Sequence, residues 1–329
     1  MIARKLLVAA LAAAALATGC AQAEVSGNDA KASFPEKNKP VTFIVPYSAG
    51  GPADSQARVA ATMLEKEMGT RVLVLNRPGG NTVVGLSELA KAKPDGYTFG
   101  MLSMPNSLAW IWPGQKAPYG KDAFAWFGSL ADASDVVVVN SDSPYKTFAD
   151  LVQDAKKRPG QIIASIEGAQ STDNLAVTNL EQAAGIDLKT AIYATGGAEK
   201  VTALLGKQTQ VATFATATAA TQVDAGKFRV LASLSPQPVP QFPDVPTATS
   251  LGYQVVSETY YTVVVPAKTP EPVRQKLEAA MKKVGESPEY QEKIKALRLT
   301  PNVRSAADTT ALVGDVEKRT QDSLHRLGS

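Results

Sequence analysis

Residues 47–54, Tyr-Ser-Ala-Gly-Gly-Pro-Ala-Asp, have the composition of a loop that binds an anion through backbone N–H groups. Gly50 and Gly51 permit a tight turn that a ligand can approach closely. Pro52 suits a first helical turn, and Asp54 can accept a hydrogen bond from an N–H group there. The N-terminus of a helix attracts anions. An ordinary strand–helix connection shows the same pattern, however, so this stretch alone favours a structural role.

The sequence lacks the residues that a catalytic, metal-binding or dinucleotide-binding site needs. His325 is the only histidine, and it lies near the end of the last predicted helix, where it suits the surface. No Gly-x-Ser-x-Gly motif supplies a hydrolase nucleophile. Neither a dinucleotide-binding glycine motif nor a metal-ligand spacing is present. The sequence therefore predicts no catalytic residue, no metal site and no cofactor, and an exported α/β hydrolase stays only as an alternative.

The elements around the candidate loop follow a strand–turn–helix pattern. Residues 41–45 are apolar on both faces, which is typical of a parallel sheet covered by helices on both sides. Residues 71–75 and 97–102 are predicted as the next two strands, each after a helix. Ser103 and Asn106 follow the third strand, and ligands of such sheets bind beyond the carboxyl ends of the strands.

A second series of strand–turn–helix units follows in the middle of the chain. The stretches 123–128 and 135–139 lead into this unit. Residues 136–139 are predicted as a strand with two apolar faces, and 161–166 as the strand before a polar turn. The two halves therefore carry similar turns, each able to offer N–H groups to one ligand between them. Candidate residues from this half are Gln170, Ser171, Thr172, Asp173, Thr195, Gly196 and Ala215.

The N-terminus has the features of a secretory signal peptide. A basic pair precedes the apolar run 6–18, which is too short to span a membrane. The small-x-small sequence at 21–23 is a cleavage site that leaves a mature chain from Glu24. We therefore predict a signal peptide over residues 1–23 and periplasmic localisation.

An alternative cleavage site would leave a lipid anchor at Cys20, because the four residues that end there resemble a lipobox. Ala17 stands where leucine is usual in that motif, which favours soluble export. Residues 24–33 are polar and predict a flexible leader.

Net charge, cysteine content and length limit the classes of function and fold that fit this chain. The chain of 329 residues has a net charge of +3, which falls to +1 when Arg4 and Lys5 leave with the signal peptide. This balance argues against nucleic-acid binding. Cys20 is the only cysteine, so the mature chain has neither a disulfide nor a thiolate metal site. About 300 mature residues exceed one comfortable core, so two domains are expected.

Six motifs, in order along the chain, resemble those of the substrate-binding proteins of tripartite tricarboxylate transporters, the Bug family. The most specific is Pro-Tyr-Ser-Ala-Gly-Gly-Pro-Ala-Asp at 46–54. The resemblance runs from residue 34 to the C-terminus. The other motifs are Asn-Arg-Pro-Gly-Gly at 76–80, Pro-Asp-Gly-Tyr-Thr at 94–98, Ala-Gly-Lys-Phe-Arg-Val-Leu-Ala at 225–232, Pro-Asp-Val-Pro-Thr at 243–247 and Val-Pro-Ala-Lys-Thr-Pro at 265–270.

The resemblance implies an α/β fold of two domains, a type II-like periplasmic binding protein of the Venus flytrap kind. Its parallel-rich sheets carry flanking helices, and a cleft lies between the domains. The chain would cross between domains near 137–141 and 256–262. Domain 1 would comprise 34–138 plus 260–329, and domain 2 would comprise 139–259.

The resemblance also implies a function. Such receptors bind a small carboxylate in the cleft and deliver it to an inner-membrane permease; we expect a monomer. An exported sensor that presents its ligand to a membrane receptor is an alternative. From domain 1, the implied ligand-binding residues are Tyr47, Ser48, Ala49, Gly50, Gly51, Asp54, Ser103, Asn106 and Tyr260.

The second loop and three other positions depart from the family pattern, which puts the ligand in question. Gln170 stands for a glycine, Thr195 for a frequent lysine, Ala215 for a frequent aspartate and Tyr260 for a usual tryptophan. Three acids near the cleft would favour a ligand with an amino or other donor group, unless they cap helices or face solvent. These acids are Glu167, Asp173 and Glu258.

Overall fold

The computed structural model describes residues 34–168, 171–193 and 197–328. Contacts divide the chain into a segment, Met1–Phe34, and a body, Pro35–Ser329; the fold below is that of the body. Outside the described residues lie the predicted signal peptide 1–23, the leader 24–33 and three of the predicted site residues: Gln170, Thr195 and Gly196.

The first part of the body alternates strands and helices, as the sequence predicts. Helix α1 begins at Pro52 and is followed by Gly69, whose left-handed backbone (φ 65°) directs its N–H to the Glu65 carbonyl. The five elements are β1 (Val41–Val45), α1 (Pro52–Met68), β2 (Val72–Asn76), α2 (Val83–Ala90) and β3 (Thr98–Met104).

The middle of the chain builds a second set of strands and helices. Thr147 and Asp150 form a reciprocal capping box at the start of α3. Ser171 caps α4 by accepting a hydrogen bond from the N–H of Asn174. The elements are the short helix η2 (Lys121–Ala123), β4 (Phe124–Asn140), α3 (Phe148–Lys157), β5 (Ile163–Ile166), α4 (Thr172–Ala184), β6 (Lys189–Ile192), α5 (Gly197–Leu205), β7 (Val211–Ala215), α6 (Thr216–Asp224) and β8 (Phe228–Ser233).

The C-terminal part returns along the first set of strands. Helix α7 buries the stripe that its spacing predicts, which includes Val273, Leu277 and Val284. The elements are η3 (Thr249–Leu251), β9 (Glu258–Pro266), α7 (Glu271–Glu286), α8 (Pro288–Ala296), β10 (Thr300–Pro301) and α9 (Ala306–Gly328).

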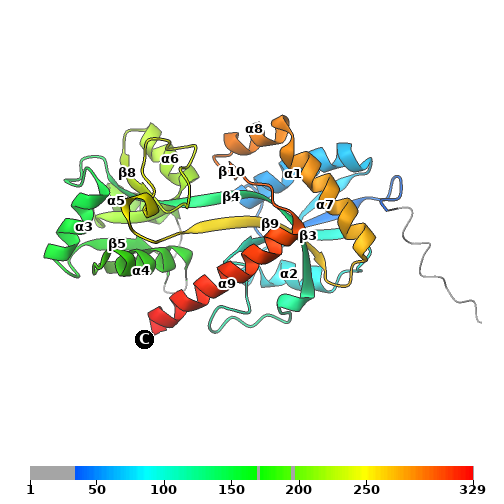
Figure 1. The fold of residues 1–329 in the computed structure, drawn as a ribbon, viewed down its shortest axis with the longest axis horizontal. Coiled ribbons are helices and arrows are strands. Elements are labelled where there is room, and N and C mark those ends of the chain that lie inside the picture. Colours follow the sequence, from blue (N-terminus) through cyan, green and yellow to red (C-terminus); the bar gives the residue numbers. More distant parts are fainter. Residues whose placement is uncertain (1–33, 169–170, 194–196, 329) are drawn as a thin grey trace, which may run out of the picture. The chain divides into compact units, whose positions relative to one another are not determined.

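The strands form one curled sheet in the order β2-β1-β3-β9-β4-β7-β5-β6, and β8 and β10 also pair with β4. The outer pairs are parallel: β1 with β2 and β3, and β5 with β6 and β7. Every pair that involves β4 or β9 is antiparallel. The two long strands β4 and β9 thus connect two parallel groups, as Figure 1 shows.

Strand β4 changes its partners part-way along. Its first part pairs with β9 from Phe124 to Ser134, and its second part pairs with β7 and β8 from Asp135 onward. The structure therefore has one continuous strand where the sequence showed two separate stretches, 123–128 and 135–139, with a strand predicted at 136–139. The change of partner also comes earlier than the crossing expected at 137–141.

Separate apolar clusters support the two strand groups. One contains Leu86, Trp126 and Val316, and brings α2 and α9 together over the first group. Another contains Val137, Leu151 and Leu180, and lies between β4, α3 and α4. Each parallel group therefore packs against helices, and Leu175 of α4 also belongs to the first cluster.

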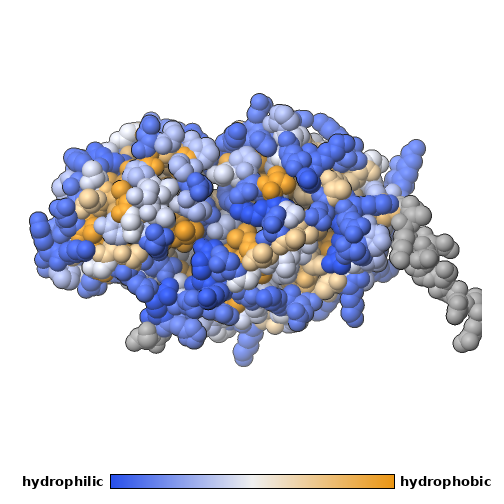
Figure 2. Space-filling view, in the orientation of Figure 1, coloured by the Kyte–Doolittle hydropathy of each residue, from blue (hydrophilic) through white to orange (hydrophobic). Residues whose placement is uncertain are grey.

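The surface of the protein carries both polar and apolar side chains. On the face in Figure 2, hydrophilic residues predominate, and hydrophobic residues form small separate groups. Scattered exposed apolar residues of this kind are normal on a protein surface. Among the described residues, no helix combines the length and the apolar character that crossing a bilayer requires.

Candidate ligand-binding site

The loop between β1 and α1 is anchored to the end of β3 by hydroxyl groups. The hydroxyl of Tyr47 contacts the hydroxyl of Ser103 and lies 3.1 Å from that of Ser107. Burial raises the pKa of Tyr47, so the phenol stays protonated at neutral pH. Strand-end residues that are distant in sequence thus fix one side of the loop.

Asp54 holds the other side of the same loop. One carboxylate oxygen accepts hydrogen bonds of 2.9 Å from the N–H of Gly50 and from Arg58, and the other accepts one of 2.9 Å from Asn76. Burial alone would raise the pKa of Asp54, but these donors lower it below its usual value. Gly50 has a left-handed backbone (φ 87°), which the turn requires. Asp54 therefore shapes the loop from behind.

An open hollow of about 570 Å³ lies against this loop, and we call it the first-loop hollow. Ser103 and Tyr261 are direct cross-strand neighbours on β3 and β9, so both reach its floor. Its lining residues are Tyr47, Ser48, Ala49, Gly51, Pro52, Ala53, Ser103, Asn106, Thr259 and Tyr261.

The second candidate loop lies between β5 and α4. The hydroxyl of Ser171 donates to the Gly168 carbonyl at 2.6 Å and also contacts Asp173. Asp173 accepts hydrogen bonds from the N–H of Glu167 at 2.9 Å and from the N–H of Asn174 at 3.0 Å. These bonds preform the start of α4, as an N-terminal cap does.

A buried lysine supports this second loop. Lys200 of α5 is only 2% exposed, and its ammonium lies 2.5 Å from Asp173 and 3.0 Å from the Thr213 carbonyl. The ammonium also lies 4.8 Å from the centre of the Phe214 ring. Asp173, one of the three acids that the sequence analysis expected near the cleft, is therefore neutralised by an internal ion pair.

A smaller cavity of about 50 Å³, which we call the Asp135 cavity, shares Thr259 with the first-loop hollow. Asp135 lies where β4 changes partner; its N–H donates to the Ser257 carbonyl at 3.0 Å, and it accepts the Ser257 hydroxyl at 2.5 Å. Polar residues of its lining include Asp135, Thr172, Ser257, Glu258, Tyr260 and Arg319.

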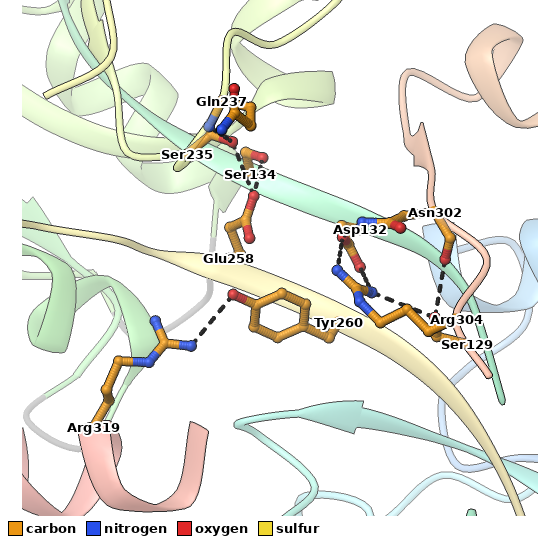
Figure 3. A network of polar contacts seen from close by, with 10 residues as sticks. All are labelled: Ser129, Asp132, Ser134, Ser235, Gln237, Glu258, Tyr260, Asn302, Arg304 and Arg319. Carbon is orange, nitrogen blue, oxygen red and sulfur yellow. Dashed lines mark hydrogen bonds and ion pairs between the residues drawn. The ribbon is translucent and has the colours of Figure 1, made fainter. Parts of the chain in front are cut away.

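Figure 3 shows the polar network beside this cavity. Arg319 of α9 donates to the Tyr260 hydroxyl at 3.4 Å. Glu258 accepts hydrogen bonds from the hydroxyls of Ser134 at 2.9 Å and Ser235 at 3.0 Å. Burial and the charge of a neighbouring carboxylate raise the pKa of Glu258. Tyr260 therefore faces the network and α9, whereas its neighbour Tyr261 faces the first-loop hollow.

A buried ion pair fixes β4 close to the same place. Arg304 donates to both oxygens of Asp132, at 2.8 and 2.6 Å, and Asn302 adds a bond of 2.7 Å (Figure 3). The guanidinium also lies 5.3 Å from the centre of the Tyr260 ring. The segment before α9 thus braces the connecting strands.

The structure brings together most of the residues predicted from the first domain. Tyr47, Ser48, Ala49, Gly51, Ser103 and Asn106 line one hollow. Gly50 and Asp54 form the backbone turn and its support behind that hollow. Thr172 and Tyr260 line the Asp135 cavity, while Ser171 and Asp173 are bonded within the second loop. Ala215 lies directly opposite Asp135 on the neighbouring strand.

Sequence reasoning missed Lys200 and Asp135. The spacing of Lys200, Ala203 and Leu204, all buried on α5, places the lysine on the apolar stripe of a helix. That position was a usable signal, because a lysine on a buried face needs a partner. Asp135 gave no such signal, since an acid at the start of an apolar strand usually reads as a surface residue. Among the described residues, no group of three potential metal ligands occurs.

Comparison with known proteins identifies relatives of this chain. A family model described as "Tripartite tricarboxylate transporter family receptor" matches residues 56–328. The chain belongs to this receptor family. The "UPF0065 protein in gbd 5'region" of Cupriavidus necator is 30% identical over 335 residues, which cover 99% of this chain and 97% of that protein.

Solved structures agree on the fold of this receptor. A TctC solute-binding protein from Polaromonas superposes with a TM-score of 0.79 at 22% identity, covering 89% of this chain and 99% of the other. The periplasmic binding protein BugD superposes with a TM-score of 0.71 at 28% identity, covering 89% and 98%. The predicted family and α/β periplasmic-binding fold are confirmed. The family consists of periplasmic solute-binding receptors, so the prediction that this protein is not an enzyme is also confirmed.

Proposed function

We propose that this receptor captures a small carboxylate in a cleft between two lobes and delivers it to a tripartite tricarboxylate-type permease. The observation that carries the proposal is the first-loop hollow, where the β1–α1 loop meets the end of β3 and Tyr261 of β9. The site lies beyond the carboxyl ends of parallel strands, where α/β sheets bind ligands.

The chemistry of the hollow suits a carboxylate that is held without a fixed cation. None of the described residues that line it carries a charge. The loop before α1 supplies backbone N–H groups, and Asn106 supplies an amide. A helix N-terminus adds about 0.3–1 kcal/mol for an anion at its first turn, and more when the site is partly buried. Several such donors around one carboxylate would give useful affinity.

The two lobes are the natural walls of such a cleft. The β1-β2-β3 group and the β5-β6-β7 group are connected through β4 and β9, and each has its own apolar cluster. We assign one lobe to residues 34–138 plus 260–329 and the other to 139–259. Antiparallel connecting strands can bend, so a ligand that contacts both lobes would shift the receptor toward a closed form.

The wall of the cleft opposite the first loop, the far wall, would be the second loop, between β5 and α4. We keep Ser171, Thr172, Asp173 and Ala215 as proposed ligand-binding residues, together with Gln170, Thr195 and Gly196. The support is that helix α4 begins at Thr172 immediately after this loop, which directs N–H groups away from the helix. Tyr260, which lines the Asp135 cavity, would contact the ligand from there.

Export completes the proposed role. We infer that residues 1–23 are removed as a signal peptide and that the receptor works as a monomer in the periplasm, with a lipid anchor at Cys20 as the alternative. A Rhodopseudomonas palustris protein of the same fold was solved with adipate, at 22% identity and a TM-score of 0.75. At that identity the likeness supports the fold, and the carboxylate assignment rests on the hollow.

Binding can be tested by a thermal-shift screen of the exported protein against carboxylates of different lengths, followed by calorimetry on the hits. A ligand at one hundred times its Kd adds about 2.7 kcal/mol of stability, which gives a clear shift. Neutral amides of the same lengths serve as controls. A carboxylate that binds while its amide does not would support the proposal. Binding of none, or equal binding of acid and amide, would contradict it.

Delivery needs a separate test. Deleting the chromosomal copy should abolish uptake of the radiolabelled ligand, and the restored chain should recover it. Uptake that survives the deletion while a ligand-induced transcriptional response is lost would point to a sensing role.

A further inference from the structure

Asp135 occupies a singular position between the two strand groups. It is the residue at which β4 leaves β9 and begins to pair with β7, opposite Ala215. Asp135 is one of the residues that line the Asp135 cavity, which shares Thr259 with the first-loop hollow. A ligand anchored in that hollow and extending along β9 would reach this carboxylate next.

The strand register places Asp135 on the face of the hollow. Tyr261 lies opposite Ala131, Thr259 lies opposite Ala133, and the N–H of Asp135 bonds to Ser257. Side chains alternate along a strand, so Tyr261, Thr259 and Asp135 share one face. The electrostatics agree, because the charge of Asp135 contributes, after burial, to raising the pKa of Tyr261.

A buried hydroxyl lies on the same face. Thr213 is opposite Val137, two pairs beyond Asp135 and Ala215, so its side chain projects to the side of Asp135. Thr213 is 2% exposed, and its hydroxyl has no partner among the described residues. A buried polar group of this kind normally bonds to protein, water or ligand.

The cationic side chains near Asp135 already form ion pairs with other acids. Lys200, the cation whose charge acts on Asp135, is bonded to Asp173 at 2.5 Å. Arg319, in the same cavity, lies 2.9 Å from Asp315 and also bonds to Tyr260. Among the described residues, the direct side-chain partner of Asp135 is the hydroxyl of Ser257.

The carboxyl of Asp135 is therefore poorly compensated. Burial raises its pKa to about 6, against the hydrogen bond from Ser257 and the charge of Lys200, while the charges of Asp173 and Glu258 add to the rise. At neutral pH the carboxylate is ionised, and a cation placed beside it would relieve this unfavourable burial.

We propose that Asp135 is the specificity residue of this receptor, and that it receives a protonated amine of the ligand, so that the preferred ligand is an amino-carboxylate. The inference rests on the proposed function, because the carboxylate of the same ligand would lie in the first-loop hollow. A plain dicarboxylate would direct its second carboxylate at Asp135 and suffer like-charge repulsion.

Matched ligand pairs test this inference on the wild-type protein. The probes are succinate against aspartate, glutarate against glutamate, and hexanoate against 6-aminohexanoate, titrated by calorimetry at pH 7.5. Each pair differs by one ammonium group. We expect at least one amino member to bind tenfold or more tightly than its partner. Equal or tighter binding of the partner in every pair would overturn the proposal.

Variants assign the preference to Asp135. In Asp135→Asn the preference should shrink at least tenfold, while Asp142→Asn, which removes an exposed acid just after the same strand, should leave it unchanged. In the wild type the preference should also decline as the pH falls from 7.5 to 5, because Asp135 takes up a proton, and Asp135→Asn should show less decline. A preference that is the same in both variants would overturn the assignment.

The outcomes separate the two proposals. Tight binding of plain dicarboxylates that is indifferent to Asp135→Asn would overturn the amine assignment and leave the carboxylate receptor standing. Binding of no carboxylate, with or without an amine, would overturn both.

Discussion

The ammonium of Lys200 lies 2.5 Å from the carboxylate of Asp173, and the lysine side chain is only 2% exposed. The pair ties the start of α4 to α5 and to the middle of β7, where Lys200 also donates to the Thr213 carbonyl. Both helices begin at loops of the proposed far wall. The ion pair therefore preorganises that wall before any ligand arrives.

Removing one partner of this pair should be costly. We expect Lys200→Ala to lower the free energy of unfolding by about 3–5 kcal/mol, because Asp173 would stay buried without its counter-charge. Chemical denaturation followed by circular dichroism measures the change. Lys207→Ala is the control, since Lys207 pairs with Asp142 on the exposed surface and its loss should barely move the midpoint. Equal effects of the two variants would show that the Lys200 pair is not specially buried.

The amide of Asn106, a half-buried residue, lines the first-loop hollow and is placed to contact a ligand there. Asn106→Ala should raise the Kd of a carboxylate hit roughly three- to tenfold, because one hydrogen bond contributes about 0.5–1.5 kcal/mol net. Calorimetry at constant pH gives the Kd. Asn140→Ala, at the far end of β4, removes an amide that bonds to the Leu204 carbonyl and should not change the Kd. An unaltered Kd in Asn106→Ala would remove this residue from the site.

The pKa of Asp135 predicts a pH dependence of stability. Its folded-state pKa of about 6 exceeds the ordinary value of 3.8, so the native state holds the proton more tightly than the unfolded state does. The resulting stabilisation is complete below about pH 4 and is lost as the pH rises through 6. Relative to the wild type, Asp135→Asn should therefore gain stability between pH 4 and 7.5, by roughly 1–3 kcal/mol. Urea titrations at several pH values measure the difference, and a constant difference would contradict the assigned pKa.

A contact between helices links the last helix to the second strand group. Asn179 of α4 accepts hydrogen bonds from Ser323 at 2.9 Å and Arg326 at 2.8 Å, both on α9. Asn179→Ala should speed hydrogen exchange in the last two turns of α9, with a loss of about 1 kcal/mol of stability. Exposed Gln182, one turn further along α4, gives the control variant Gln182→Ala. Unchanged protection in Asn179→Ala would mean that the contact does not hold α9.

The local parts of the fold could be predicted from the sequence. β1 and the start of α1 follow from an apolar run, a glycine turn and Pro52, all within a dozen residues. The single long β4 could not be predicted, because its middle carries polar side chains such as Asp132 that look like a break. Asp132 is instead satisfied by Asn302 and Arg304, which lie 170 and 172 residues away.

Part of the candidate site could likewise be predicted from the sequence, and part could not. The first-loop residues lie together because one motif contains most of them, and the end of β3 follows from the parallel order of the strands. Asp135 shares a face with Thr259 and Tyr261 only through the register of the strands, and the partner of Asp173 comes from another helix. Such pairings depend on tertiary packing, which a single sequence does not display. The predicted role of each site residue in binding stays a prediction.

The most direct test of the account is a crystal structure of the receptor with the best carboxylate from the calorimetric screen. We predict that a ligand carboxylate lies in the first-loop hollow, within hydrogen-bond distance of the backbone between Tyr47 and Gly51, with the rest of the ligand directed toward Asp135. The second loop should contact the same molecule. A ligand seated instead in the groove between α4 and α9, beside Gln182 and Arg326, would contradict the central claim.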